Sequence, residues 1–171
     1  MNCYLIDTNS LITPYRSYYS FDFGDNFWNQ LKDSIHNQKI LFTRSVYDEI
    51  VEKSEDVLTV WLKNIDDLKI IKEFNNSNIM KNYQSIMQYI QECGLYKKSA
   101  LTKWSSDSIA DALIIATAIH FQYPIITLER PTGNLSQKQP SKNPKIPDVA
   151  NHFGVECISL FDFMRLMKFQ L

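Results

Sequence analysis

Short runs of apolar residues alternate along the chain with longer segments in which apolar residues recur at helical spacing. Such short runs, bounded by polar or turn-forming residues, are typical of strands joined to helices. The four runs are Cys3 to Ile6, Ile40 to Phe42, Ile125 to Leu128 and Val155 to Ile158. Because the runs are apolar throughout, we expect them to form a buried parallel sheet of about four strands.

The longer segments predict helices that cover this sheet, which makes the fold class α/β. A polar loop rich in proline, lysine and serine is expected from Arg130 to Lys145. The expected helices carry the stripes Phe27, Leu31 and Ile35; Val57, Trp61 and Ile65; and Ile79, Tyr83, Met87 and Ile90, and two more run from Asp111 to His120 and from Phe161 to Phe169.

Length and composition favour one folded domain over residues 1–171. Hydrophobic residues make up 44% of the chain and charged residues 22%, which is ordinary for a folded protein. Cys3, Cys93 and Cys157 are scattered and odd in number, so we expect no disulfide framework and a reducing, cytoplasmic compartment. No apolar run is long enough to cross a bilayer, and we expect no membrane partner.

Four carboxylates follow the predicted strands or begin the helices next to them. Asp7 ends the first strand, Glu129 ends the third, and Glu49 is expected in the first turn of the helix after the second. Asp111 lies early in an otherwise small and apolar helix. Because the carboxyl ends of parallel strands share one edge of a sheet, we expect these four side chains to converge there.

Clustered carboxylates repel one another and are costly to bury unless a cation neutralises them. Ligands that are all oxygen favour Mg²⁺ or Mn²⁺ over zinc, and such sites commonly serve phosphoryl chemistry. The net charge of −1 does not indicate a polyanionic partner, so nucleic-acid binding has to come from local charge. The residues thus point to metal-dependent phosphodiester hydrolysis.

The chain resembles the PIN-domain family in four motifs that occur in the family's order. The segment YLIDTNSLI begins at Tyr4, VYDEI at Val46, ADALIIATA at Ala110 and ITLE at Ile126. The aromatic segment from Tyr18 to Trp28 and the tail after Lys145 are similar to a less characterised branch, a domain of unknown function.

This resemblance implies a three-layer α/β/α fold and an Mg²⁺- or Mn²⁺-dependent endoribonuclease. In many cases such a protein is the toxin of a type II toxin–antitoxin pair, VapC-like, homodimeric and bound by a cognate antitoxin. Asp7 and Asp111 would hold the main metal ion, while Glu49 and Glu129 bind it through water or hold a second ion. Asn9 and Thr127 would orient these carboxylates. The family often has Asp where this chain has Glu129, and the longer side chain could weaken a second metal site.

Structural roles compete with several of these assignments. Asp7 could cap the turn that follows it, and Ser45 with Asp48 resembles a capping box that makes Glu49 a first-turn residue. Asp107 and Asp148 could each ligate metal, but their positions favour helix N-termini. The histidines, His36, His120 and His152, show no spacing typical of a metal site.

RNA contacts are expected from a basic loop that directly follows Glu129. The candidates are Arg130, Lys138, Lys142 and Lys145, with a solvated loop as the alternative. The aromatic residues from Tyr18 to Trp28 could stack on bases, but their pattern favours core or dimer surface.

Two functions from other classes stay open. A phosphatase of the haloacid dehalogenase type also begins with an acidic residue after a strand, but it needs a second Asp where this chain has Asn9. A catalytically weak PIN-like module that binds RNA or protein is the other alternative.

Overall fold

A computed structural model describes residues 3–53, 55–106 and 109–171. Within them, five parallel strands form one sheet in the order β3-β2-β1-β4-β5. The strands are β1 (Tyr4–Ile6), β2 (Ile40–Thr43), β3 (Ile70–Ile71), β4 (Ile125–Ile126) and β5 (Cys157–Ile158). The order places β1 at the centre, so that the chain crosses over between the two halves of the sheet beside β1.

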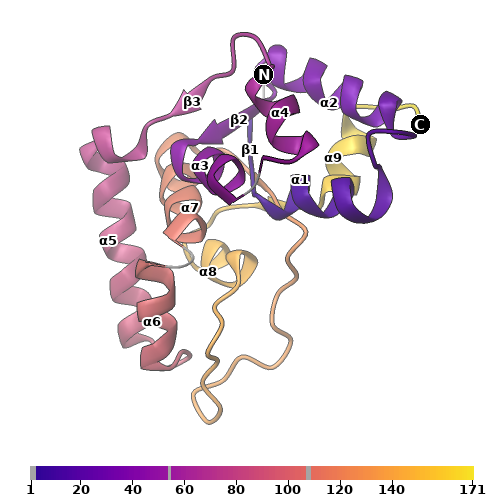
Figure 1. Ribbon diagram of the computed structural model, residues 1–171. Helices are drawn as coiled ribbons and strands as arrows, with labels where there is room; N and C mark the ends of the chain where they lie inside the picture. The colour runs from indigo at the N-terminus through magenta and orange to yellow at the C-terminus, as the bar shows by residue number, and fades with distance from the viewer. Residues whose placement is uncertain (1–2, 54, 107–108) are drawn as a thin grey trace.

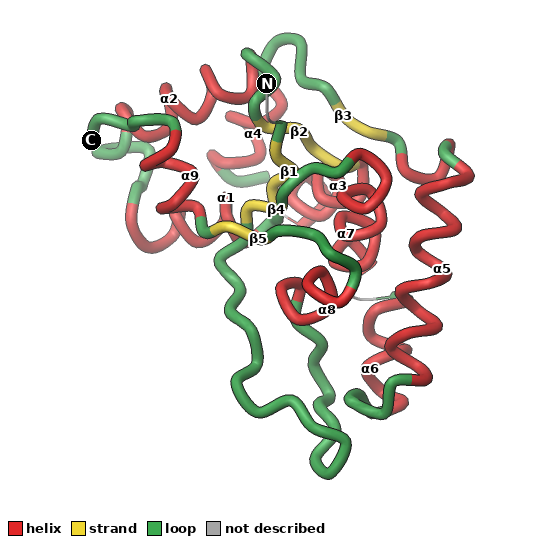
Figure 2. The backbone as a smooth tube through the Cα atoms, turned by 180° about the vertical axis from the view of Figure 1, so that it is seen from behind, coloured by secondary structure: helices red, strands yellow, loops and turns green. Residues whose placement is uncertain are grey.

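Helices cover both faces of the sheet and give a three-layer α/β/α arrangement (Figure 1). They are α1 (Asn9–Thr13), the π-helical turn η1 (Pro14–Tyr18), α2 (Asp25–His36), α3 (Arg44–Lys53), α4 (Val57–Lys63), the 3₁₀ turn η2 (Glu73–Asn75), α5 (Ser77–Glu92), α6 (Lys98–Ser105), α7 (Ile109–Phe121), α8 (Ile146–His152) and α9 (Leu160–Leu166). Both views of the backbone place α2, α4 and α9 on one side of the molecule and α5, α6 and α7 on the other (Figures 1 and 2).

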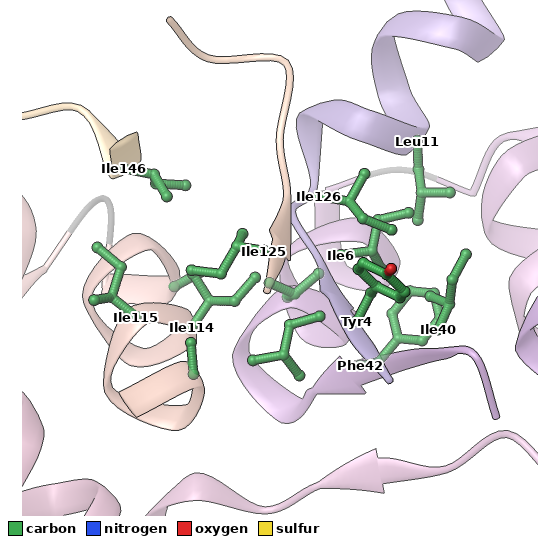
Figure 3. Packing of buried hydrophobic residues seen from close by; sticks show 14 of the residues in the cluster. Tyr4, Ile6, Leu11, Ile40, Phe42, Ile114, Ile115, Ile125, Ile126 and Ile146 are labelled. Carbon is green, nitrogen blue, oxygen red and sulfur yellow. The ribbon is translucent and has the colours of Figure 1, made fainter. Parts of the chain in front are cut away.

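The core is continuous through the sheet. Side chains from β1 and β2 lie between α1 on one side and α7 on the other, and Ile114 and Ile115 of α7 pack toward Ile125 of β4 (Figure 3). The helix α7 is apolar around almost its whole circumference, because β2 and β4 lie on one side of it and α3, α5, α6 and α8 on the others. Its buried position explains why a charged residue in its first turn needs a partner.

The predicted α/β class, the four predicted strands and the parallel pairing are confirmed. The fifth strand, β3, was not predicted, and neither were α1, η1 and α6. The expected helix start at Asp148 is confirmed, because Asp148 lies in the first turn of α8. The stripe predicted for α4 is wrong in part, because Val57 is 54% exposed while Leu58 and Leu62 are buried. Asp56 caps the first turn of α4 through the Thr59 amide, and this start turns the next residue, Val57, outward.

The aromatic segment before and within α2 is mostly core. Phe27 and Trp28 are buried, and Phe21 stacks on Trp28 with ring centroids 4.3 Å apart. Tyr18 and Phe23 stay exposed at 50% and 70%. The preference for core is therefore confirmed for most of the segment but not for Tyr18 and Phe23.

The loop between β4 and α8, residues 127–145, extends away from the body of the molecule (Figure 2). Its far end is tied to the rest of the chain, since the Lys97 amide donates to the Ser141 carbonyl and the Ser141 amide donates to the Leu95 carbonyl. Across the described residues, every helix is too short or too polar to span a membrane.

Candidate metal centre

Asp7 is brought next to Thr127 by the register of the sheet. Ile6 of β1 pairs with Ile126 of β4, so the residues that follow them lie side by side at the same sheet edge. The Thr127 hydroxyl donates a hydrogen bond of 2.9 Å to the Asp7 carboxylate, and Asp7 is buried, with 2% of its surface exposed. Thr127 thus makes the expected hydrogen bond to one of the four carboxylates.

Asp111 lies in the first turn of α7, as the sequence predicted, and is partly buried. The pKa of the Asp111 carboxyl is raised to about 8, mainly by burial and in addition by the negative charges of Asp7, Glu129 and Glu49, while Lys145 acts to lower it. Electrostatic effects of this kind require proximity. All three other carboxylates therefore act on Asp111.

The pKa of Asp7 is raised as well, to about 7. Loss of water around the buried carboxyl is the main cause, and the charges of Glu129 and Glu49 add to it, against the Thr127 hydrogen bond, which lowers the pKa. Two aspartates that are difficult to ionise thus lie in one place. Raised carboxylate pKa values are common at functional sites, because a site built for a cation leaves its ligands crowded without it.

Glu49 lies in the second turn of α3, not the first, because α3 starts at Arg44 directly after β2. Its carboxylate accepts a hydrogen bond of 2.6 Å from the Thr8 hydroxyl, which joins it to the residue after Asp7. Glu49 is therefore not a first-turn residue, and the favourable interaction of a first-turn carboxylate with the helix dipole does not explain its presence here.

The predicted capping box at Ser45 and Asp48 is also wrong. The buried carboxylate of Glu73 accepts hydrogen bonds from the Arg44 amide at 2.9 Å and the Ser45 amide at 3.0 Å, while Asp48 forms an ion pair with Arg44. A side chain from η2 thus caps α3 and fixes the helix that carries Glu49. No local pattern in the sequence identifies such a distant cap.

Glu129 is held by the end of the 127–145 loop, where the chain enters α8. Its carboxylate accepts a hydrogen bond of 2.6 Å from the Lys145 ammonium and one of 2.8 Å from the Ile146 amide at the start of α8. Lys145, one of the residues expected to bind substrate, therefore supplies positive charge inside the acidic cluster.

The four predicted carboxylates line a single cavity of about 340 Å³. Its lining comes from the turn after β1, the start of α1, α3, α6, α7 and the loop between β4 and α8. It consists of Asp7, Thr8, Asn9, Glu49, Lys103, Trp104, Asp111, Glu129, Asn143, Pro144 and Lys145. Sequence reasoning missed Lys103, which donates to the Asn143 side chain at 3.0 Å, and Trp104. The apolar spacing of Ala100 and Trp104 is the signal that could have found their helix.

The remaining candidates lie outside this cavity or, like Asn9, at its edge. Asp148 accepts two hydrogen bonds from the Thr132 amide and anchors the loop. Asn9 is exposed at the edge of the cavity, and among the described residues its side chain makes no hydrogen bond to a carboxylate. Asp107 lies outside the described residues. Lys138 and Lys142 are exposed on the loop, and Arg130 is exposed beside Glu129.

The histidines have structural partners. His120 lies within hydrogen-bond distance of Asn76, and His152 stacks on Tyr89 with centroids 3.8 Å apart. In the described part of the chain, no three His, Cys, Asp or Glu side chains are already arranged around a common metal position. A cation would have to draw the carboxylates closer together, and Glu129 would have to share its charge with Lys145.

A larger cavity of about 920 Å³ adjoins the acidic one and shares Asn9, Glu129 and Lys145 with it. It extends toward β5 and α9, and its lining includes Tyr18, Arg130, Phe161 and Arg165. The two cavities thus lie side by side at the carboxyl edge of the sheet.

No curated protein matches the sequence. A family model described as a domain of unknown function, DUF4411, matches residues 4–171. The match covers the whole sheet, all four carboxylates and both cavities. The chain therefore belongs to the DUF4411 family.

Proposed function

We propose that this protein is a metal-dependent endoribonuclease of the PIN-domain kind. The observation that supports it best is the meeting of Asp7, Glu49, Asp111 and Glu129 in one cavity, although the sequence separates them by up to 122 positions (129 − 7). Two of these carboxyls have raised pKa values, and among the described residues that line the cavity the ammonium groups are those of Lys103 and Lys145. Such a site has the charge and the oxygen donors that Mg²⁺ or Mn²⁺ requires.

In this proposal Asp7 and Asp111 hold the cation, and Glu49 contributes through its position beside Thr8. Thr127 keeps the Asp7 carboxylate in one orientation. Glu129 holds Lys145 at the boundary of the two cavities, where its ammonium can meet a phosphate oxygen. A bound divalent cation supplies the positive charge that stabilises the transition state of phosphodiester hydrolysis.

The test is cleavage of an end-labelled single-stranded RNA by purified protein with Mg²⁺ or Mn²⁺. We expect cleavage that stops with a chelator and falls at least about a hundredfold in Asp7→Asn and Asp111→Asn, since each loses a ligand. Asp66→Asn, a change at an exposed aspartate outside both cavities, is the matched control and should cut like the parent. Equal cleavage by all four proteins would mean that a contaminant cuts the RNA.

The same assay separates the alternatives. A haloacid-dehalogenase-like phosphatase should release phosphate from a monoester and leave the RNA chain intact, whereas a binding module should bind RNA without any cleavage. The exposed Asn9, where a phosphatase of that class needs a second aspartate, favours the nuclease.

The proposal includes a toxin role, which rests on the resemblance to the VapC-like proteins. Induced expression should arrest bacterial growth, Asp7→Asn should not, and co-expression of a small neighbouring protein should restore growth if it is the antitoxin. Arrest by the Asp7→Asn protein would remove the link between growth arrest and this site.

A further inference from the structure

The larger cavity differs from the acidic cavity in three features: exposed aromatic rings, guanidinium groups and a volume of about 920 Å³ against about 340 Å³. Tyr18 is 50% exposed and Phe161 38% exposed, and their ring centroids lie 6.1 Å apart at 63°. Both rings line this cavity, although they come from η1 and α9, at opposite ends of the chain. Exposed aromatic rings at such a place offer surfaces on which bases can stack.

Positive charge lies in the same cavity. Arg130 follows Glu129 directly and, within the described residues, makes no ion pair. Arg165 forms an ion pair of 2.7 Å with Asp162, which lies on the α9 side of the cavity. The positive charge of Arg165 therefore offsets the negative charge of Asp162. Asp162 keeps its charge, since the Ser159 hydroxyl and Arg165 hold the pKa of its carboxyl below the usual range. Two guanidinium groups thus face the space beside two aromatic rings.

The cavity adjoins the proposed cleavage site, with Asn9, Glu129 and Lys145 in the walls of both. A chain whose phosphate lies at the carboxylates and Lys145 would continue toward Arg130 with its next bases beside Phe161 and Tyr18. Figure 2 shows α1, α9 and the first part of the loop after β4 on the same side of the sheet, so these elements can contact one strand together. A duplex keeps its bases stacked inside and cannot offer them to protein rings.

We infer that the cavity lined by Tyr18, Arg130, Phe161 and Arg165 is the subsite that binds unpaired nucleotides of single-stranded RNA next to the cleaved phosphodiester. The inference rests on the proposed nuclease function. It assigns the two rings to bases and the two guanidinium groups to phosphates, and it makes the protein selective for single strands.

The experiment measures binding and chemistry separately. Binding is measured by fluorescence anisotropy with a labelled seven-nucleotide single-stranded RNA in the Asp7→Asn background, where the RNA stays intact. Chemistry is measured by hydrolysis of bis(p-nitrophenyl) phosphate with Mn²⁺, a diester too small to reach both rings. If the proposed function is wrong, the parent does not hydrolyse the diester. If only the subsite is wrong, the parent hydrolyses the diester but the subsite variants bind RNA like the parent.

We expect Tyr18→Ala and Phe161→Ala each to weaken RNA binding by about fivefold or more, the usual consequence of losing one base stack. Arg130→Gln should weaken RNA binding. It should also reduce the slope of the affinity against salt concentration by about the amount that one phosphate contact contributes. The diester rate should stay at the parent level in Tyr18→Ala and Phe161→Ala, because this diester does not reach both rings. A duplex of the same sequence should bind at least about tenfold more weakly, because its bases are paired.

Matched controls lie outside the cavity. Phe74→Ala removes a ring that is 61% exposed on η2, and Arg16→Gln removes a guanidinium on η1 that lines neither cavity. Unfolding temperatures verify that each variant is folded, and the more exposed Tyr18 serves if Phe161→Ala is unstable. Parent-like RNA binding by Tyr18→Ala and Arg130→Gln, or equal binding of duplex and single strand, would overturn the subsite.

Discussion

The Thr127 hydroxyl donates to the Asp7 carboxylate over 2.9 Å and accepts from the Glu129 backbone amide over 3.1 Å, so one side chain links the Asp7 carboxylate to the backbone of Glu129. The contact with Asp7 follows from the pairing of Ile6 with Ile126, which places the ends of β1 and β4 side by side. The hydrogen bond lowers the pKa of Asp7 against the effect of burial. Thr127 therefore helps to keep Asp7 in the charged form that a cation needs.

Replacing Thr127 by valine should weaken metal binding by roughly 10- to 100-fold, the range seen when a group that orients a ligand is lost. Valine fills the same space but donates nothing, so the pKa of Asp7 should rise further. Thr127→Ser keeps the hydroxyl and is the matched control. Calorimetric titration with Mn²⁺ measures both, and equal affinities for the valine and serine variants would contradict the orienting role.

Without metal, Asp7→Asn and Asp111→Asn should be more stable than the parent at pH 8. The folded-state pKa values of about 7 and 8 lie above the ordinary 3.8, so the folded protein binds more protons than the unfolded chain between these values. The parent therefore loses stability as the pH rises from about 4 to 8, by an amount on the order of a few kcal/mol. The amide variants lack this loss.

Urea unfolding with a chelator at pH 5 and pH 8 measures the difference. Asp66→Asn, outside the cavity, is the control and should follow the parent at both values of pH. A parent that is as stable at pH 8 as at pH 5 would show that the aspartates are not crowded in solution.

Lys145→Gln should increase Mn²⁺ affinity but slow RNA cleavage. Lys145 is the positive group next to Glu129, and it lowers the pKa of Asp111, so its loss makes the cavity more negative. The phosphate then loses its contact with the ammonium. Lys142→Gln, in the exposed part of the same loop, should change neither quantity much. Weaker Mn²⁺ binding in Lys145→Gln would mean that this lysine supports the site by structure alone.

Glu73→Gln should destabilise the protein by about 1–3 kcal/mol, because the buried carboxylate caps two amides at the start of α3. Metal affinity should fall as well, since α3 carries Glu49. Ser45→Ala, which removes the hydroxyl contacts to Glu73 and Thr43 but keeps both capped amides, should cost less. Urea unfolding and Mn²⁺ titration check the two effects, and an unchanged unfolding free energy would refute the capping role.

The sequence predicted the centre of the fold well because the central strands are apolar runs. β1, β2 and β4 are buried on both faces, and such strands differ clearly from amphipathic helices. The edge strand β3 contains only Ile70 and Ile71, half-buried, which is too short to show a period. The helix α6 was missed because its apolar positions are only Ala100, Leu101 and Trp104 in eight residues.

The candidate site was predictable where residues follow a strand or start a helix next to the sheet edge. Asp7 and Asp111 are of this kind, and the sheet edge gathers them. The partners of Glu129 were not predictable, because Lys145 reaches it only after the 127–145 loop returns, and no sequence period describes such a path. The cap from Glu73 depends on a contact 28 residues away from Ser45 and escapes local patterns for the same reason.

The central claim is that Asp7 and Asp111 hold the same divalent cation, and calorimetric titration of Mn²⁺ into the parent and the two single asparagine variants tests it most directly. The account predicts one saturable binding event in the parent that weakens at least about tenfold in Asp7→Asn and in Asp111→Asn alike. Parent-like Mn²⁺ binding in either variant, or no binding in the parent, would contradict it.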